Sequence, residues 1–290
     1  MSATPADLGR LDGPVLLFGG PYSNLQATAA VLDAARNHDI PPARTICTGD
    51  VVAYGADPQA TVDLVRAAGI HVVMGNCEES LGAEAEDCGC GFAEGSACAV
   101  ASARWYAHAA AGLSADARRW MAGLPRRLDF NLADRRFAVV HGGVRQINRF
   151  VFASTPAAEK LTELAFAGTD AIVAGHCGLP FSQVLDGRLW HNAGVVGMPA
   201  NDGTPRAWYS LLEATAGGIR IGHHALDYDH AAAARRMRAC DLPAGYADAL
   251  ETGLWPSLDV LPPAERTATG RALEATTHHW PSTHALRRVS

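Results

Sequence analysis

The chain has no long hydrophobic run and no surplus of basic residues. Although 48% of its 290 residues are hydrophobic, no apolar stretch reaches the roughly 18 residues that a membrane-spanning helix needs. Residues 1–12 are polar and show no basic segment followed by an apolar one, so we expect no signal peptide. We therefore predict a protein without membrane association that is located in the cytoplasm.

The charge balance is acidic. Asp and Glu number 30 against 24 Lys and Arg, which gives a net charge of −6, and both signs are interspersed along the chain. A general nucleic-acid binder would present a basic face, so nucleic-acid binding is disfavoured. Short Arg pairs do occur, but pairs of this kind are typical of solvated helix surfaces.

The hydrophobic pattern predicts alternating strands and helices in the first part of the chain. We expect strands at 14–18, 45–51 and 71–74, and helices at 24–36 and 58–68. Later patterns predict helices at 97–110, 115–121 and 229–240, and strands at 127–132, 137–140, 171–174, 181–185, 188–191, 207–213 and 218–223. We expect a single domain over 1–262 with a helical insertion at about 78–124. The tail 263–290 is weakly patterned, and we expect its stretch 278–281 to be poorly ordered.

Four polar residues follow apolar runs and lie beside glycines. They are Asp50, Asn76, His141 and His176. Each is expected at the end of a strand, on a tight loop that glycine permits. One carboxylate, one amide and two imidazoles form a donor set suited to Mn, Fe or Zn, with Mg as a further option.

The loops that contain these residues form an ordered motif series. It consists of Gly49-Asp50, Gly75-Asn76-Cys77-Glu78, His141-Gly142-Gly143, Gly175-His176-Cys177-Gly178 and the turn Asn192-Ala193-Gly194-Val195-Val196-Gly197-Met198-Pro199. The series resembles the calcineurin-like metallophosphoesterase superfamily, in particular its small bacterial phosphoesterases, over roughly residues 14–225. The resemblance implies an α/β fold: a four-layer metallophosphoesterase-like sandwich of two mixed β-sheets flanked by helices. It also implies a site with two metals and a water between them that attacks phosphorus.

Carried over by position, the resemblance gives one complete metal site and one that is lost. Asp50 matches the bridging carboxylate, and Asn76, His141 and His176 match the other ligands of one metal. The remaining ligands of the second metal align with Gly20, Tyr22 and Gly178, and the family's catalytic His aligns with Cys77. We therefore expect one divalent metal ion in an altered, mononuclear site.

The same alignment suggests roles in catalysis and substrate binding. Cys77, Asp50 and His141 are the candidate catalytic residues. The candidate substrate-binding residues are Tyr22, Asn24, Arg145 and Arg149. For Asn24 the alternative is a helix cap, and for the two arginines it is ion pairing.

The seven cysteines are unevenly placed, and several lie close to the motif loops. Cys77, Cys88, Cys90 and Cys177 are candidate thiolate ligands, which would favour zinc or iron. A separate structural zinc, held by Cys77, Cys88, Cys90 and Cys98, is one alternative. Buried free thiols are the other.

These observations favour a metal-dependent hydrolase of phosphoric esters, either a phosphomonoesterase or a phosphodiesterase, that acts on a small phosphorylated substrate. One alternative is a non-catalytic metallophosphoesterase-like protein with a binding or regulatory role. Another is different chemistry at an iron or zinc site with thiolate ligands. The sequence predicts neither the substrate nor the oligomeric state.

Overall fold

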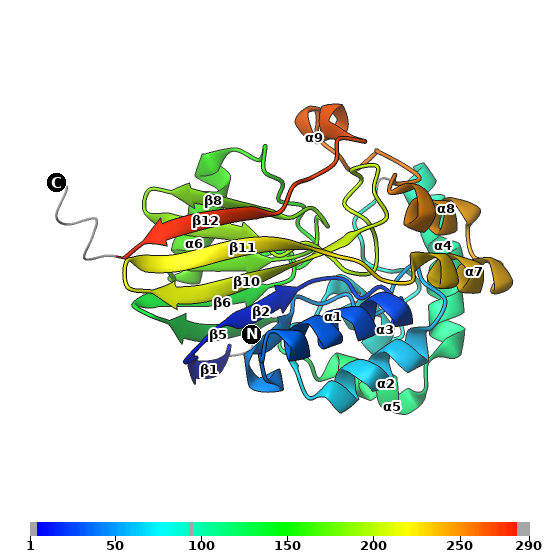
Figure 1. The fold of residues 1–290 in the computed structure, drawn as a ribbon. Coiled ribbons are helices and arrows are strands. Elements are labelled where there is room, and N and C mark those ends of the chain that lie inside the picture. Colours follow the sequence, from blue (N-terminus) through cyan, green and yellow to red (C-terminus); the bar gives the residue numbers. More distant parts are fainter. Residues whose placement is uncertain (1–4, 93–94, 283–290) are drawn as a thin grey trace.

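The computed structural model describes residues 5–92 and 95–282. Two six-stranded mixed sheets face each other at the centre of the protein. Figure 1 shows their arrangement. The first sheet has the strand order β1 (Ala6–Arg10), β5 (Arg127–Leu132), β6 (Arg135–Val140), β7 (Ala171–Ala174), β9 (Arg188–Asn192), β8 (Phe181–Leu185). The second has the order β12 (Thr276–Pro281), β11 (Gly218–Leu226), β10 (Ala207–Thr215), β2 (Val15–Phe18), β3 (Thr45–Cys47), β4 (His71–Val72).

The inner faces of the two sheets share one apolar core. Leu17 and Ile46 come from the second sheet, and Phe130 and Phe137 come from the first. The two phenylalanine rings stack with their centroids 4.7 Å apart, and Trp280 of β12 meets Phe137 edge to face. Burial of these side chains is the main favourable term that holds the sheets together.

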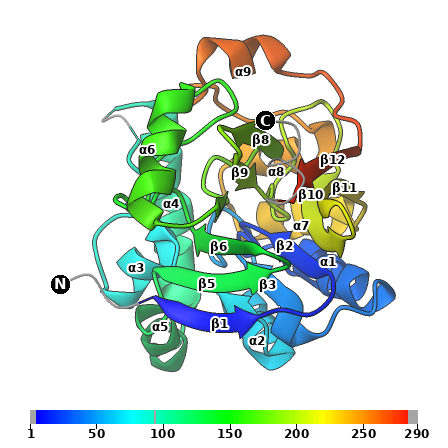
Figure 2. The same cartoon turned by 90° about the vertical axis from the view of Figure 1, so that its left-hand side faces the viewer.

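Helices cover the outer faces, which completes four layers and confirms the expected fold class. α1 (Leu25–Asn37) and α2 (Pro58–Ala68) pack over β2 and β3 through Val31 and Val62. On the opposite side, α6 (Ala157–Ala167) packs on β7 and β9 through Leu164, as Figure 2 shows. The other helices are η1 (Pro42–Arg44), α3 (Asn76–Gly82), α4 (Ala97–Gly112), α5 (Ala115–Ala122), α7 (His230–Ala239), α8 (Ala244–Thr252) and α9 (Pro263–Ala268).

The region expected to be a helical insertion at 78–124 contains α3, α4 and α5. The expectation of poor order at 278–281 is wrong, because these residues form part of β12. The strand pairs with β11, and Trp280 is only 1% exposed. Its indole donates to the carbonyl of Gly187, and the guanidinium of Arg135 lies 4.3 Å from its ring centre. Burial of this large ring holds the segment on the sheet.

Parallel pairing brings the motif loops to one edge of the sandwich. β2, β3 and β4 run parallel in one sheet, and β6, β7 and β9 run parallel in the other. A backbone hydrogen bond from Gly19 to the carbonyl of Gly194 joins the two sheets there. α4, α7 and α8 lie beyond this edge, on the right in Figure 1. None of the helices in the described ranges has both the length and the apolar character to cross a membrane.

Candidate metal centre

Four side chains from both sheets converge on one point, as the sequence predicts. His141 Nε2 lies 3.1 Å from Asn76 Oδ1, 2.9 Å from His176 Nδ1 and 3.2 Å from Asp50 Oδ2. Asp50, His141 and His176 are the described His, Cys, Asp and Glu residues whose donor atoms cluster closely enough to hold a metal ion. All of them are buried.

The hydrogen bonds around the cluster direct lone pairs inward. The carbonyl of Thr48 lies 2.7 Å from His141 Nδ1 and accepts a hydrogen bond from that nitrogen, so Nε2 is the ring atom that faces Asp50, Asn76 and His176. The amide of Asn76 donates to the carbonyl of Cys88, so its Oδ1 is turned toward His141. Nitrogen and oxygen lone pairs that face one another at this distance repel unless a proton or a metal cation lies between them.

The surroundings of His176 are compatible with this fit. Its Nε2 is fully buried and finds no hydrogen-bond partner among the described residues, whereas Nδ1 faces His141. The ring of Phe150, 4.2 Å away between centroids, covers His176. A cation at Nδ1 would use the lone pair there and leave Nε2–H beside the aromatic ring. The residues present therefore fit a bound divalent cation.

Glu78 shapes the loop that carries Asp50, although the sequence analysis gave it no role. Asp50 has a backbone φ of 55°, which is rare for a residue with a side chain. The buried carboxylate of Glu78 accepts from the backbone N–H groups of Asp50, Val51 and Gly75 at 2.7, 2.8 and 2.9 Å. An acidic residue three positions after Gly75, at the start of α3, was the signal that could have revealed it.

The electrostatics link these groups. Burial lowers the pKa of His141, but the Asp50 charge and hydrogen bond outweigh it, so the pKa is raised. At Asp50, burial alone would raise the carboxyl pKa, but the charge and hydrogen bond of His141 outweigh burial and lower it. Burial and the neighbouring His141 lower the pKa of His176 to about 3, and burial with the Asp50 charge raises that of Glu78 to about 7.

Aromatic rings lie beside the two glycines that are predicted to replace ligands of a second metal. A Cβ on Gly20 would lie 2.4 Å from the ring of Tyr22, and Gly20 has a φ of 41°. At Gly178, with a φ of 76°, a Cβ would lie 3.3 Å from the ring of Trp255. The indole of Trp255 is fixed by donation to the carbonyl of Pro199 at 2.7 Å. The rings of Tyr22 and Trp255 therefore make the region beside these glycines aromatic.

The thiolate prediction has mixed outcomes. Cys88 and Cys90 form a disulfide, so in this structure neither is a free thiolate, and no zinc site formed by four cysteines is present in the described residues. Cys77 and Cys177 are buried free thiols. Burial raises the pKa of both thiols. Cys77 is 1% exposed, so the acid–base role predicted for it gains no support from the geometry.

Of the predicted substrate-binding residues, one lies near the metal centre and three have structural roles. Tyr22 lies beside the metal centre. Asn24 caps α1 by accepting from the backbone of Ala27, which is the alternative role. Arg145 and Arg149 both pair with the buried Glu163 of α6 at 2.9 Å, so ion pairing accounts for them.

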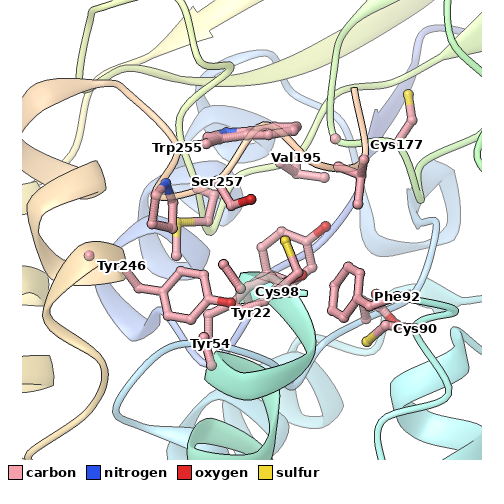
Figure 3. A pocket seen from close by; sticks show the side chains of 18 of the residues that line it. Tyr22, Tyr54, Cys90, Phe92, Cys98, Cys177, Val195, Tyr246, Trp255 and Ser257 are labelled. Carbon is pink, nitrogen blue, oxygen red and sulfur yellow. The ribbon is translucent and has the colours of Figure 1, made fainter. Parts of the chain in front are cut away.

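A cavity of about 250 Å³ opens beside Asp50 and His176. Figure 3 shows its wall, with Trp255 above the space and Tyr22 and Tyr246 below. The sequence analysis missed Tyr246 and Trp255, because they follow the motif series and belong to α8 and the loop after it.

Comparison with known families decides the relationship. The model of the calcineurin-like phosphoesterase superfamily domain matches residues 22–217, more than half of the chain. The chain belongs to this superfamily. Membership agrees with the resemblance found in the motif loops and with the four-layer fold.

Individual relatives extend this result. The chain is 27% identical over 210 residues to "Uncharacterized protein MJ0912" of Methanocaldococcus jannaschii, covering 66% of this chain and 79% of that protein. The metallophosphoesterase from Sphaerobacter thermophilus has a similar structure, with a TM-score of 0.65, 24% identity and coverage of 83% and 99% of the two chains. The hypothetical protein PH1004 from Pyrococcus horikoshii matches with a TM-score of 0.68, 15% identity and the same coverage. At these identities the structural matches support the fold.

Proposed function

We propose that this protein is a metal-dependent hydrolase of phosphoric esters that works with one divalent metal ion. The observation that supports this most strongly is the convergence of Asp50 Oδ2, Asn76 Oδ1 and His176 Nδ1 around His141 Nε2. Two imidazoles and two oxygens favour Mn, Fe or Zn over Mg. The cytoplasmic location predicted from the sequence is part of this proposal.

Bound at these residues, the ion would act as a Lewis acid toward a phosphoryl oxygen. The protein's own groups prepare the site for that role. Thr48 fixes the ring of His141, and Glu78 holds the strained loop of Asp50. Burial and the nearby Asp50 raise the pKa of Tyr22 well above its usual value, so the phenol keeps its proton and is a neutral donor beside the cavity.

Phosphate release from methyl phosphate tests the hydrolase function. The purified protein, supplied in parallel with Mn²⁺ or Zn²⁺, should release phosphate. Asp50→Asn should reduce kcat/KM at least about 100-fold, because it removes the charge that the ion faces. Asp63→Asn is the matched control, since Asp63 is exposed on α2. Equal activity of Asp50→Asn and wild type would contradict the proposal.

A non-catalytic binding role is the second candidate. The observation that favours it is that Gly20, Tyr22 and Gly178 stand where the family has ligands of its second metal, with aromatic rings beside both glycines. Under this hypothesis the wild type binds a metal ion but releases no phosphate from either a monoester or a diester. Turnover that depends on Asp50 would exclude it.

A further inference from the structure

The cavity beside the metal centre has walls that are mainly aromatic and aliphatic. The rings of Tyr22, Tyr54, Tyr246, Trp255 and Phe150 line it together with Met198. Several rings brace one another: Tyr54 lies 4.9 Å from Tyr22 and 4.8 Å from Tyr246, between centroids. Rings held in this way form a preorganised surface for stacking against another flat group.

Charge on the cavity wall is confined to one end. Among the described residues that line it, no Lys or Arg is present, and the ionisable groups besides tyrosines and cysteines are Asp50 and His176 of the metal centre. If a negatively charged group of a ligand lay in the cavity away from the metal centre, no positively charged side chain would be near it. The occupant of the apolar part is therefore uncharged.

The volume of the cavity is sufficient for an aromatic ring system. An apolar cavity of about 150 Å³ is enough to take up benzene. At about 250 Å³ this one holds a larger flat group such as a fused pair of rings. The group would lie against the aromatic walls while anything attached to it reaches Asp50 and His176.

We infer that this cavity binds the flat, uncharged aromatic group of a phosphoric ester whose phosphoryl end lies at Asp50 and His176. The inference rests on the proposed hydrolase function and specifies its substrate class. In the hydrolysis, the oxygen of a water molecule bonds to phosphorus and the bond from phosphorus to the aryl oxygen breaks. The electron pair stays on that oxygen, which takes up a proton, so phosphate and a neutral aromatic alcohol are released.

Binding of 2-naphthol, the uncharged alcohol itself, tests the cavity without requiring catalysis. Calorimetric titration of the full chain should show saturable binding with one site. Ala101→Phe places a ring into the cavity from α4 and should weaken this binding at least about 10-fold. Ala103→Phe makes the same change on an exposed position of α4 and should leave the affinity unchanged. Trp255→Leu is the second variant, and it should also weaken binding, because it removes one stacking surface.

Kinetics supply the second readout. The kcat/KM for 2-naphthyl phosphate should exceed that for methyl phosphate at least about 10-fold, and Ala101→Phe should remove most of this preference. If the wild type binds 2-naphthol and Ala101→Phe weakens this binding, the cavity assignment is supported even when neither ester is hydrolysed. Failure to hydrolyse either ester would refute only the hydrolase function. Absence of saturable binding to the wild type, or equal binding by Ala101→Phe, overturns the assignment even if methyl phosphate is turned over.

Discussion

Replacing Glu78 by Gln should destabilise the protein strongly, although the two side chains have nearly the same shape. The carboxylate accepts three backbone N–H groups within 2.9 Å, from Asp50, Val51 and Gly75. Both Asp50 and Gly75 donate to the same oxygen, Oε2. If the amide nitrogen of Gln takes that place, two buried donors face a third donor.

The magnitude follows from those two orphaned groups. Each buried donor without a partner costs about 1–3 kcal/mol, so two of them should lower the free energy of unfolding of Glu78→Gln by about 2–6 kcal/mol, a loss that removal of the buried charge beside Asp50 partly offsets. If the amide turns the other way, it faces the N–H of Val51 at 2.8 Å and the more distant N–H of Val52 at 3.4 Å, and the cost falls to about 1–3 kcal/mol because the second bond is weak. The loop of Asp50 would relax in both cases, so metal affinity should fall as well.

Guanidinium unfolding at pH 8 measures this effect. That pH lies above the pKa of about 7 for Glu78, so the wild type carries the carboxylate. Glu79→Gln is the matched control, because Glu79 is the next residue in α3 and pairs with Arg126 while remaining partly exposed. We expect it to change stability by less than about 1 kcal/mol. Equal stability and equal metal affinity in Glu78→Gln and Glu79→Gln would refute the reasoning.

Three further predictions concern other parts of the chain. Burial lowers the pKa of His223 from 6.5 to about 3, so below pH 6.5 the unfolded chain binds a proton that the folded chain excludes. The free energy of unfolding that neutral His223 contributes above pH 6.5 is thus lost as the pH falls toward 3, and the loss is about 2–3 kcal/mol at pH 4.5. Urea titrations at the two pH values should show a smaller loss for His223→Gln than for the wild type. Gly178→His should lower the free energy of unfolding by about 1–2 kcal/mol, because of the φ of 76° and the ring of Trp255, and metal analysis should show no second ion. Trp280→Ala should lower the free energy of unfolding by about 3–5 kcal/mol in the same titrations, because it empties a fully buried site between the sheets; a loss below 1 kcal/mol would show that β12 is dispensable.

Local signals predicted much of the fold, but the sequence analysis gave no element at β1, α6, α8, α9 or β12. The helix at 58–68 has the observed bounds, because Pro58 marks its first residue and Gly69, with a φ of 66°, ends it. Strand β12 was missed because its residues before Trp280 are exposed and show no alternation. Its stability depends on pairing with β11 and on the burial of Trp280, and both are tertiary effects that a local pattern does not contain.

The candidate site divides in the same way. Asp50, Asn76, His141 and His176 could be predicted, because a polar residue that follows an apolar run and lies next to a glycine is typical of the end of a parallel strand. Two other features could not be predicted: the hydrogen bonds between Glu78 and the loop of Asp50, and the aromatic rings that line the cavity. Tyr246 and Trp255 are distant in sequence from the metal ligands, and only the folded arrangement of α8 brings them to the cavity.

Metal content of the purified protein tests the central claim most directly. We expect the wild type, after incubation with excess Mn²⁺ or Zn²⁺ and removal of free ions, to retain about one ion per chain by elemental analysis. His141→Ala should retain far less than one, whereas His71→Ala, on the partly buried strand β4 outside the cluster, should match the wild type. Two tightly bound ions per chain, or one ion retained by His141→Ala, would contradict the account.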